Sequence, residues 1–463
     1  MSRAALVSLV GLLIAGVAGQ WVLDAFGDRA TDFWTGAIVH GVATIPYIIL
    51  CRAAVAGRYR PGFVHAFALV VLLRLLALPL QPALSDDVYR YMHEGTMVLE
   101  GHNPYVTAPA DVPLDQRHPE YWKLINNKDV PAAYPPAVQF ALVAGVTISP
   151  TPLGMKIFFG VCDLLIFVVL WLWLPRIGSK PRLAIVHGFC PLMVLEFAGE
   201  GHSDTLAVLF VLLCLFAYSH GRRHVSGAML AIATAGKLLP LVLLPFVARK
   251  KWWVLLPFCV VLSILYARFV WGLAIGDWPG IFHGTVRYAD TWRANDSVFY
   301  IFHLGSEIVL EWLKSAGVQT DLEFYPHRLA KVPIVLFGSL LLILAWVRQW
   351  PIQKVAAALF MVFVSFTPTM HPWYLAFLVP FLCIYPSTLW LVFTGSIYLA
   401  YHVRPDWIAM QQAVAPGVRE HVAEVVEDLV IKIVEYVPFY LGFIGVLLDT
   451  RSGAATDRQS TKR

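Results

Sequence analysis

The residues best suited to chemistry in this chain lie in the segment 85–95, which reads SDDVYRYMHEG. Asp86 and Asp87 are adjacent, and Arg90 and Glu94 follow Asp87 at three and seven positions. Residues at this spacing share one face of a helix, so the pattern predicts a short interfacial helix. A carboxylate can take a proton from an attacking hydroxyl, and positive charge stabilises a departing phosphate. The segment is therefore a candidate site for group transfer from a phosphate ester to a hydroxyl.

A structural role for the same residues is the alternative. Asp86 can cap the predicted helix, and Asp87 can pair with Arg90 or Tyr91. Three acids, two tyrosines and an arginine gather within ten positions, and this concentration favours function. We take Asp87 as the first candidate catalytic base and Asp86 as the second.

Other candidate residues lie further along the chain. Lys237 interrupts an apolar run; an ionisable group at membrane depth is costly and marks a functional site, with snorkelling to the interface as the alternative. We expect Arg90, Lys237 and His371 to bind a phosphate. We expect the pocket for the transferred group or for its acceptor to comprise Tyr91, Glu94, His102, Asn103, Tyr105, Tyr134, His202, Asp204, Trp373 and Tyr374.

One cluster of acids and a histidine raises the hypothesis of a metal site, which we do not favour. Glu200, His202 and Asp204 could in principle hold a divalent ion, but their spacing fits no standard site. We therefore expect no cofactor.

The composition sets the class of protein. The 463 residues are 58% hydrophobic and 14% charged, with a mean hydropathy of +0.66, whereas an average soluble domain has about 25% charged residues. This excludes an ordinary soluble enzyme or nucleic-acid binder. Since a crossing takes about 20 apolar residues, we expect an all-α polytopic membrane protein, a bundle of roughly 11–14 transmembrane helices.

The apolar and polar stretches divide the chain. We expect N-terminal transmembrane helices over 1–83, followed by a catalytic extracytoplasmic loop with interfacial helices over 84–135. A transmembrane core over 136–273 and a second extracytoplasmic loop over 274–330 come next. The chain then has C-terminal transmembrane helices over 331–450, with an extracytoplasmic loop at 403–430, and a cytoplasmic tail over 451–463.

Basic residues near helix ends set the orientation. Three arginines within 52–60 place that turn and both termini in the cytoplasm, and the loop after it outside. The middle of the chain allows two arrangements. If 136–149 and 226–247 are both full crossings, five basic residues between 176 and 223 lie outside; if both are re-entrant or hairpin pieces, these residues lie inside. We favour the second, because 136–149 is short and Lys237 interrupts 226–247.

Several blocks carry a family resemblance. Three blocks together resemble the first extracytoplasmic loop of bacterial GT-C glycosyltransferases: SDDVYRYMHEG at 85–95, GHNPY at 101–105 and YPPAVQ at 134–139. The similarity continues through PLMVLEFAGEGHSDTLAVL at 191–209, GKLLPLVLLP at 236–245 and SFTPTMHPWYLAFLVPF at 365–381. One departure is His93, where the pattern has an aromatic residue, and it leaves the sugar preference open.

The resemblance implies an activity. It suggests a transferase of the mannosyltransferase-like branch that moves a hexose, mannose in first place, from a polyprenyl-phosphate carrier to an extracytoplasmic glycan or glycolipid. It further implies inversion at the anomeric carbon, with Asp87 as base and Glu94 at a position usually held by Asp or Glu. The expected location is the bacterial inner membrane, with the site facing the periplasm or exterior and no nucleic-acid partner. The alternative is a transporter or flippase of a lipid-linked sugar, which would also explain charges at membrane depth.

Overall fold

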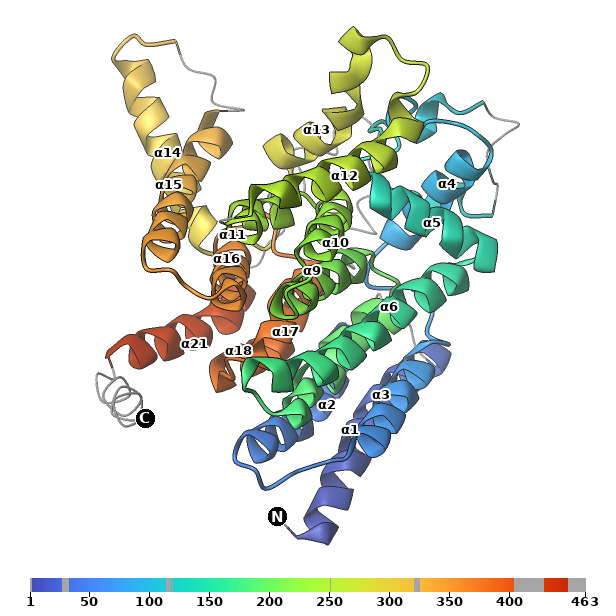
Figure 1. The fold of residues 1–463 in the computed structure, drawn as a ribbon, viewed down its shortest axis with the longest axis vertical. Coiled ribbons are helices and arrows are strands. Elements are labelled where there is room, and N and C mark those ends of the chain that lie inside the picture. The colour runs from blue at the N-terminus through green and yellow to red at the C-terminus, as the bar shows by residue number, and fades with distance from the viewer. Residues whose placement is uncertain are drawn as a thin grey trace.

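The computed structural model describes residues 2–26, 33–113, 118, 120–249, 251–319, 325–403 and 429–448, and in these residues the secondary structure is helical (Figure 1). The expected polar loop at 403–430 and the tail at 451–463 lie almost wholly outside the described residues. An all-helical chain of this composition satisfies its backbone polar groups internally, as lipid requires. The expected fold class, an all-helical polytopic membrane protein, is confirmed over the described residues.

Several helices are long and apolar enough to cross a membrane. Among the described residues they are Arg3–Asp24, Phe33–Val55, Pro152–Ile177, Trp252–Val270 and Pro326–Val347. A sixth candidate is a broken pair, Pro181–Gly188 and Pro191–Gly199, bent by 60°. Five further apolar helices have 10–17 residues: Phe63–Ala77, Pro136–Ile148, Asp204–Ser219, Leu239–Ala248 and Ile352–Phe366.

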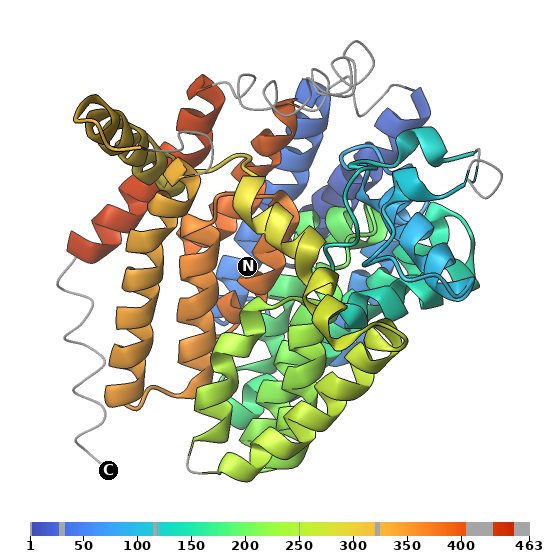
Figure 2. The same ribbon diagram turned by 90° about the horizontal axis from the view of Figure 1, so that it is seen from above.

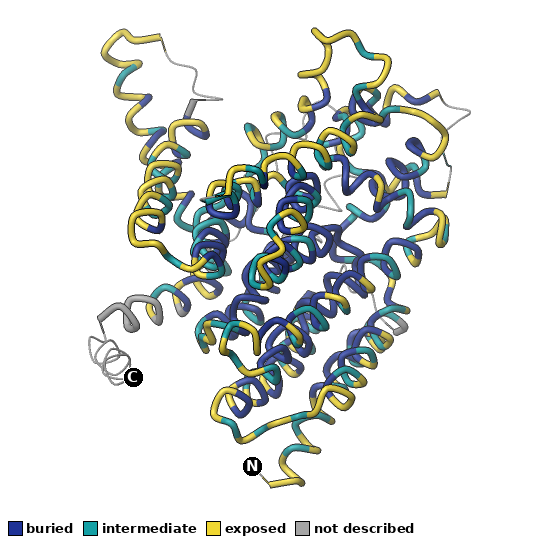
Figure 3. The backbone as a smooth tube through the Cα atoms, in the orientation of Figure 1, coloured by how far each residue is buried: buried dark blue, intermediate teal, exposed yellow. Residues whose placement is uncertain are grey.

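The helices form one packed bundle. Its centre is made by α6 (Pro152–Trp173), α9 (Asp204–Ser219) and α10 (Arg223–Gly236), with α5 (Pro136–Ile148) and α12 (Leu255–Val270) beside them. Figure 3 shows α9 largely buried, whereas α15 (Tyr325–Val347) is mostly exposed. The exposed apolar side chains of α15 suit contact with lipid rather than with water.

N-terminal helices flank this centre. They are α1 (Arg3–Phe26), α2 (Phe33–Val55) and α3 (Phe63–Ala77). The C-terminal helices complete the bundle. They are α16 (Ile352–Phe366), η10 (Pro372–Phe377), α17 (Val379–Leu382), α18 (Thr388–Ser396), η11 (Ile397–Val403) and α21 (Leu429–Leu448). Of these, α16 and α21 lie on the opposite side of the molecule from the segment that follows Asp87 (Figure 2).

The window 226–247 is broken, because α10 ends at Gly236 and a separate short helix, α11 (Leu244–Ala248), follows a 3-10 turn. The polar stretch 274–330 is mainly helical and holds α13 (His283–Thr291) and α14 (Val298–Ser315). Window hydropathy did not predict these helices because they are amphipathic, with polar residues lowering the average.

The basic turns of the chain gather at one end of the bundle. Arg182 donates to the Ala54 carbonyl at 2.8 Å, and Arg176 donates to the Ser219 carbonyl at 3.3 Å. The ring of His224 contacts that of Trp253, with ring centroids 4.1 Å apart, and Arg249 donates to the carbonyl of Trp346 at 2.6 Å. The turns near 52–60, 174–182, 219–224, 249–254 and 346–354 are thereby linked, as the second of the two arrangements requires.

The other end of the bundle carries the acidic segment. Helix α10 starts in a basic turn at Arg223 and ends 14 residues later at Gly236, a rise of about 21 Å. Helix α9 runs the opposite way, from Asp204 to the basic turn after Ser219. Lys237 and Asp204 therefore lie at the end of the bundle away from the basic turns.

A buried ion triad accounts for charges within the bundle. Arg74 binds Asp163 through Nε at 2.8 Å and Nη2 at 2.7 Å, and His187 Nε2 lies 2.7 Å from Asp163 Oδ1. Arg74 also donates to the carbonyl of Gly188. All three side chains are buried, so Arg74 does not snorkel to an interface. The triad ties α3 to α6 and to the broken pair.

Candidate functional site

A cavity of about 540 Å³ lies where the acidic segment meets the bundle. Its lining comes from separate parts of the chain: 84–94, 126–135, 236–239, 284–295, 370–374 and 400–402. It thus collects the loop after α3, the break after α10, the helix α13 and the turn before η10. A cavity of this size accommodates a substrate of drug or sugar size.

Helix α4 (Asp87–Leu99) carries the acids, as the spacing predicted. Asp86 is its N-cap residue but makes no side-chain capping bond. Instead, the amide of Asn126 donates to Asp86 Oδ1 at 2.8 Å and to Asp87 Oδ1 at 2.9 Å. The hydroxyl of Tyr134 donates to Asp87 Oδ2 at 3.3 Å. Both carboxylates line the cavity and are only partly exposed.

The surroundings make Asp87 a stronger base than an ordinary aspartate. Burial and the neighbouring Asp86 charge raise the pKa of Asp87 to about 6, against the opposing effect of the Asn126 hydrogen bond. Asp204 raises this pKa further, so it also lies near. A pKa close to the working pH suits a general base, because the group is ionised yet basic.

The segment before α4 is held by two buried side chains. Glu200 Oε2 accepts hydrogen bonds from the backbone N–H groups of Ala83 and Leu84, both at 3.0 Å. Lys156 donates to the carbonyl of Leu78 at 2.6 Å and to that of Leu80. These bonds fix the path of the chain just before the aspartate pair.

The facing wall carries a cation. Lys237 Nζ lies 2.5 Å from Asp204 Oδ1 and 3.7 Å from the ring centroid of Tyr374. The side chain of Lys237 keeps 25% of its surface exposed, so it can meet a ligand in the cavity. Tyr374 in turn shares a hydrogen bond of 2.6 Å with the hydroxyl of Tyr288 on α13.

Trp373 stacks between two histidines. Its ring lies 3.8 Å from that of His202 and 4.3 Å from that of His371, with interplanar angles of 16° and 7°. Burial and the nearby Lys237 lower the pKa of His371 to about 3, and burial lowers the pKa of His202 well below its usual range. His371 lines the cavity as a neutral imidazole, able to donate a hydrogen bond but carrying no full charge.

Two of the predicted residues are paired with each other. Arg90 Nε lies 2.6 Å from Glu94 Oε1, and Arg90 also donates to the carbonyls of Asn127 at 2.9 Å and Val130 at 2.7 Å. Glu94 Oε2 accepts from Gln139 at 2.6 Å. Both side chains border the cavity but are buried. Their bonds anchor the returning loop 127–130 to α4, and Arg90 pairs with Glu94 rather than with Asp87.

The remaining predicted residues lie beside the cavity or away from it. Tyr91 lies behind the cavity and donates to the hydroxyl of Tyr134 at 3.1 Å. Asn103 donates to the carbonyl of Phe269 at 2.7 Å, and Tyr105 donates to that of Tyr134 at 2.6 Å. The GHNPY motif therefore fastens the loop to the end of α12 instead of lining the cavity.

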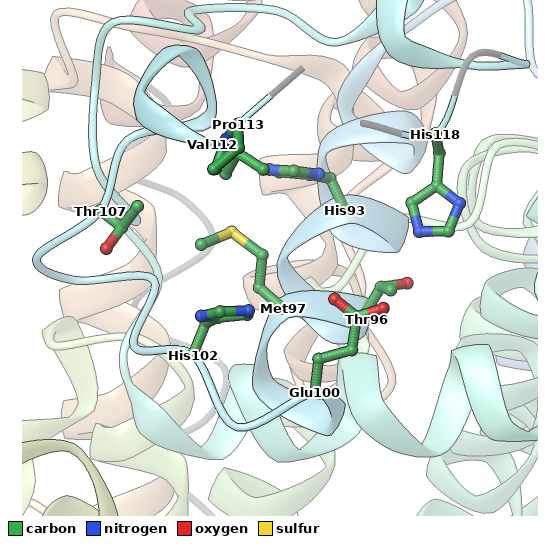
Figure 4. Close-up of a pocket in the computed structure, with 9 residues that line it drawn as sticks. All are labelled: His93, Thr96, Met97, Glu100, His102, Thr107, Val112, Pro113 and His118. Carbon is green, nitrogen blue, oxygen red and sulfur yellow. The ribbon is translucent and has the colours of Figure 1, made fainter. Parts of the chain in front are cut away.

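His102 borders a second and smaller cavity. This space of about 40 Å³ lies on another side of α4, among His93, Glu100, His102 and His118 (Figure 4). Over the described parts of the chain, no three His, Cys, Asp or Glu side chains are grouped so that they could hold a metal ion.

The lining of the main cavity also includes residues outside the predicted set, among them Asn126, Tyr288 and Arg293. Asn126 and Arg293 lie in polar loops without local pattern. Tyr288 belongs to α13, which packs closely against the loop before α5. A Cβ on Gly284 would lie 2.4 Å from the carbonyl oxygen of Pro131, and Thr285 donates to the Ala133 carbonyl at 2.8 Å. Only this long-range packing reveals their role.

The fold and the site define a polytopic, all-helical membrane protein with an acidic cavity at one end of its bundle. The chain belongs to the alpha-(1->6)-mannopyranosyltransferase family, whose N-terminal domain model matches residues 6–252, and it also matches the model of glycosyltransferase family 87 over residues 133–379. The resemblance to GT-C glycosyltransferases is thereby confirmed.

One curated relative is the alpha-(1->6)-mannopyranosyltransferase A of Mycobacterium tuberculosis (strain ATCC 25618 / H37Rv). It is 26% identical over 224 residues, which are 46% of this chain and 41% of the relative. The match therefore spans less than half of either protein. No solved structure matches the chain.

Proposed function

We propose that this protein is a membrane glycosyltransferase that moves a mannosyl group from a polyprenyl-phosphate donor to a hydroxyl of a glycan or glycolipid. The observation that carries the proposal is the placing of Asp87 and Lys237 on the lining of one cavity. Family membership and the mannosyltransferase relative support the reaction class and the sugar.

Asp87 is the proposed general base. It takes the proton from the acceptor hydroxyl as the oxygen attacks the anomeric carbon, and the bond from that carbon to the phosphate oxygen breaks with its electron pair leaving on the phosphate. A single displacement of this kind inverts the anomeric configuration. The raised pKa of Asp87 and its hydrogen bonds to Asn126 and Tyr134 support this role.

Lys237 is the proposed partner of the leaving phosphate. A phosphate is a good leaving group that needs positive charge rather than a proton donor. The partly exposed Lys237, flanked by Tyr374, meets this need, and neutral His371 adds a hydrogen-bond donor. Arg90 is engaged by Glu94 and two carbonyls, so we assign it to positioning the loop.

The sugar is proposed to lie between these groups. Tyr288 and Tyr134 offer aromatic surface on the cavity lining, and Asp86 and Asn126 offer polar atoms for sugar hydroxyls. The stack of Trp373 between His202 and His371 covers both faces of the Trp373 ring and holds His371 in a fixed place on the lining, which lowers the entropic cost of binding.

The cavity is proposed to open on the extracytoplasmic side of a bacterial inner membrane, with both termini in the cytoplasm. The five linked basic turns, between 52 and 354, contain no acidic residue in sequence. Such an excess of Lys and Arg is typical of cytoplasmic ends. A lipid-linked donor suits a site at the opposite end, since the sugar then meets Asp87 at the surface while the polyprenyl chain stays in lipid.

The test uses the purified protein in lipid nanodiscs with radiolabelled polyprenyl-phosphate mannose and a membrane glycolipid extract. We expect labelled glycolipid from the wild type and a loss of about 10²–10⁴-fold for Asp87→Asn, the usual contribution of a general base. Transfer from a nucleotide sugar instead of the lipid donor would overturn the donor assignment. Label that crosses a vesicle bilayer without forming product would identify a transporter instead.

A further inference from the structure

A second hollow lies at the basic end of the bundle, far from the aspartate pair. It has a volume of about 720 Å³ and is open to the surroundings of the protein. Its walls come from the last turns of α2 and from the start of α18. The two helices pack directly, since a Cβ on Gly395 would lie 2.7 Å from Thr44 Cγ2. The hollow is therefore a fixed feature of a helix–helix contact.

The polar part of the hollow attracts anions. Arg52 and Arg58 line it, and neither side chain makes an ion pair or hydrogen bond within the described residues. Ser387 and Thr388 add two hydroxyls. The nine-residue helix α18 begins there, and the N–H groups of a first helical turn have no intrahelical partners.

More positive charge surrounds these groups. Arg60 and Arg182 donate to the carbonyls of Gly57 and Ala54, both at 2.8 Å, beside the same turn. Their Nη2 atoms lie 3.3 and 3.6 Å from the position that a Cβ would take on Gly57. The sequence has no acidic residue between Arg52 and Arg60 or between Leu174 and Arg182. Several guanidinium groups thus converge there, and Arg52 and Arg58 have no acidic partner among the residues that the structure describes.

The rest of the hollow is apolar and continues along the bundle. Ile49 and Leu391 line it beside the arginines. On α2, Ile45, Ile49 and Arg52 share one face by their spacing, and Ile45 is 63% exposed. On α18, Val392 follows Thr388 by one turn and is 44% exposed. An apolar stripe therefore leads from the cationic end of the hollow into the region expected to contact lipid.

We propose that this hollow binds the headgroup of an anionic phospholipid from the membrane leaflet at the basic end. The phosphodiester lies between Arg52 and Arg58, the hydroxyls of Ser387 and Thr388 donate to it, and an acyl chain follows Ile49 and Ile45. Basic pockets between helices on the cytoplasmic side are suited to such headgroups. The continuous apolar stripe selects a lipid over a free phosphate ion, which would gain nothing from it.

The test measures phosphatidylglycerol bound to the full-length protein by native mass spectrometry from detergent. We expect Arg52→Ala with Arg58→Ala to weaken binding by about tenfold or more, since each basic residue near an anionic lipid surface contributes about 1 kcal/mol. The matched control is Arg222→Ala with Arg348→Ala, which removes the same charge from the same end outside the hollow. The control is expected to change affinity by less than about twofold.

Three outcomes would overturn the proposal. Equal losses in both double variants would mean general attraction to the basic end. If the Arg52 and Arg58 double variant still binds phosphatidylglycerol as the wild type does, and unfolds at the wild-type temperature, the hollow is not the lipid-binding site. Displacement of the lipid by inorganic phosphate at the same concentration as by phosphatidylglycerol would identify an ion site without lipid selectivity. Because lipid binding is the measurement, its outcome is independent of glycosyl transfer.

Discussion

The side-chain amide of Asn126, 39 residues along the chain from Asp87, donates a hydrogen bond of 2.9 Å to its Oδ1 atom. The same amide donates to Asp86 at 2.8 Å. One neutral donor therefore holds two adjacent carboxylates that repel each other. This contact orients the proposed base and moderates the rise of its pKa.

Replacing the proposed base should remove activity while strengthening the fold. Folding raises the pKa of Asp87 from 3.8 to about 6, so the folded state binds a proton more tightly than the unfolded state. The stability from this group is present below pH 3.8 and is lost as pH rises through 6. Asp87→Asn should thus melt above the wild type at pH 7.5, with the difference shrinking toward pH 4.

The control for this substitution is Glu100→Gln, at the exposed C-cap of the same helix. It should leave both transfer and melting temperature near wild type. Thermal unfolding in detergent and transfer in nanodiscs are the two measurements. A melting temperature of Asp87→Asn below that of the wild type would contradict the raised pKa of Asp87. Retained transfer by this variant would show that Asp87 is not the general base.

The pH dependence of transfer should follow Asp87. Activity needs the carboxylate, so kcat should fall as pH drops through about 6. Asp86→Asn removes a neighbouring negative charge that raises the pKa of Asp87, and the acidic midpoint should move to lower pH. An unchanged midpoint in Asp86→Asn would show that another group controls the profile.

Asn126→Ala should move the same midpoint in the opposite direction. The Asn126 hydrogen bond lowers the pKa of Asp87, so its loss should raise the midpoint. The kcat at neutral pH should also fall, because the carboxylate loses an orienting contact. Comparing the pH profiles of Asn126→Ala and Asp86→Asn checks the direction of each shift in the acidic midpoint. If both variants moved the midpoint in the same direction, the contacts of Asp87 with Asn126 and Asp86 would not control its pKa.

Lys237→Met should weaken the use of the lipid-linked donor. The substitution removes the cation proposed to meet the phosphate, and a hydrogen bond to a charged group is worth about 1.5–3 kcal/mol. The KM for the donor or the kcat should change by about tenfold or more. Lys123→Met, an exposed residue of the first loop, is the control. Unchanged donor kinetics in Lys237→Met would assign the lysine to its ion pair with Asp204 alone.

Glu200 should act as a positioning residue for the aspartate pair. Its carboxylate accepts both N–H groups at 83–84, and leaving buried donors unpaired costs about 1–3 kcal/mol each. Glu200→Leu should lower kcat with little change in KM and lower the melting temperature, whereas Glu200→Gln, which keeps an acceptor oxygen, should recover much of both. Equal losses in the two variants would argue against the hydrogen-bond role.

Local pattern was sufficient for several features. The spacing from Asp87 to Glu94 predicted helix α4, and low charge with long apolar runs predicted the polytopic helical class. Both depend on interactions between residues close in sequence or on average composition, which a single sequence carries in full. The motif blocks likewise pointed to the family that the comparisons confirm.

Only the tertiary structure decided which polar residues face the cavity. Arg90 and Glu94 share the predicted face of α4, yet they bind each other and the returning loop. His102, Asn103 and Tyr105 belong to a matching motif but lie outside the main cavity, while Asn126, Tyr288 and Arg293 enter it from distant segments. The bonds of Arg90 to the returning loop and the packing of α13 against that loop depend on contacts between residues tens to hundreds of positions apart. Sequence spacing specifies the face of a helix, and packing between helices specifies what that face meets.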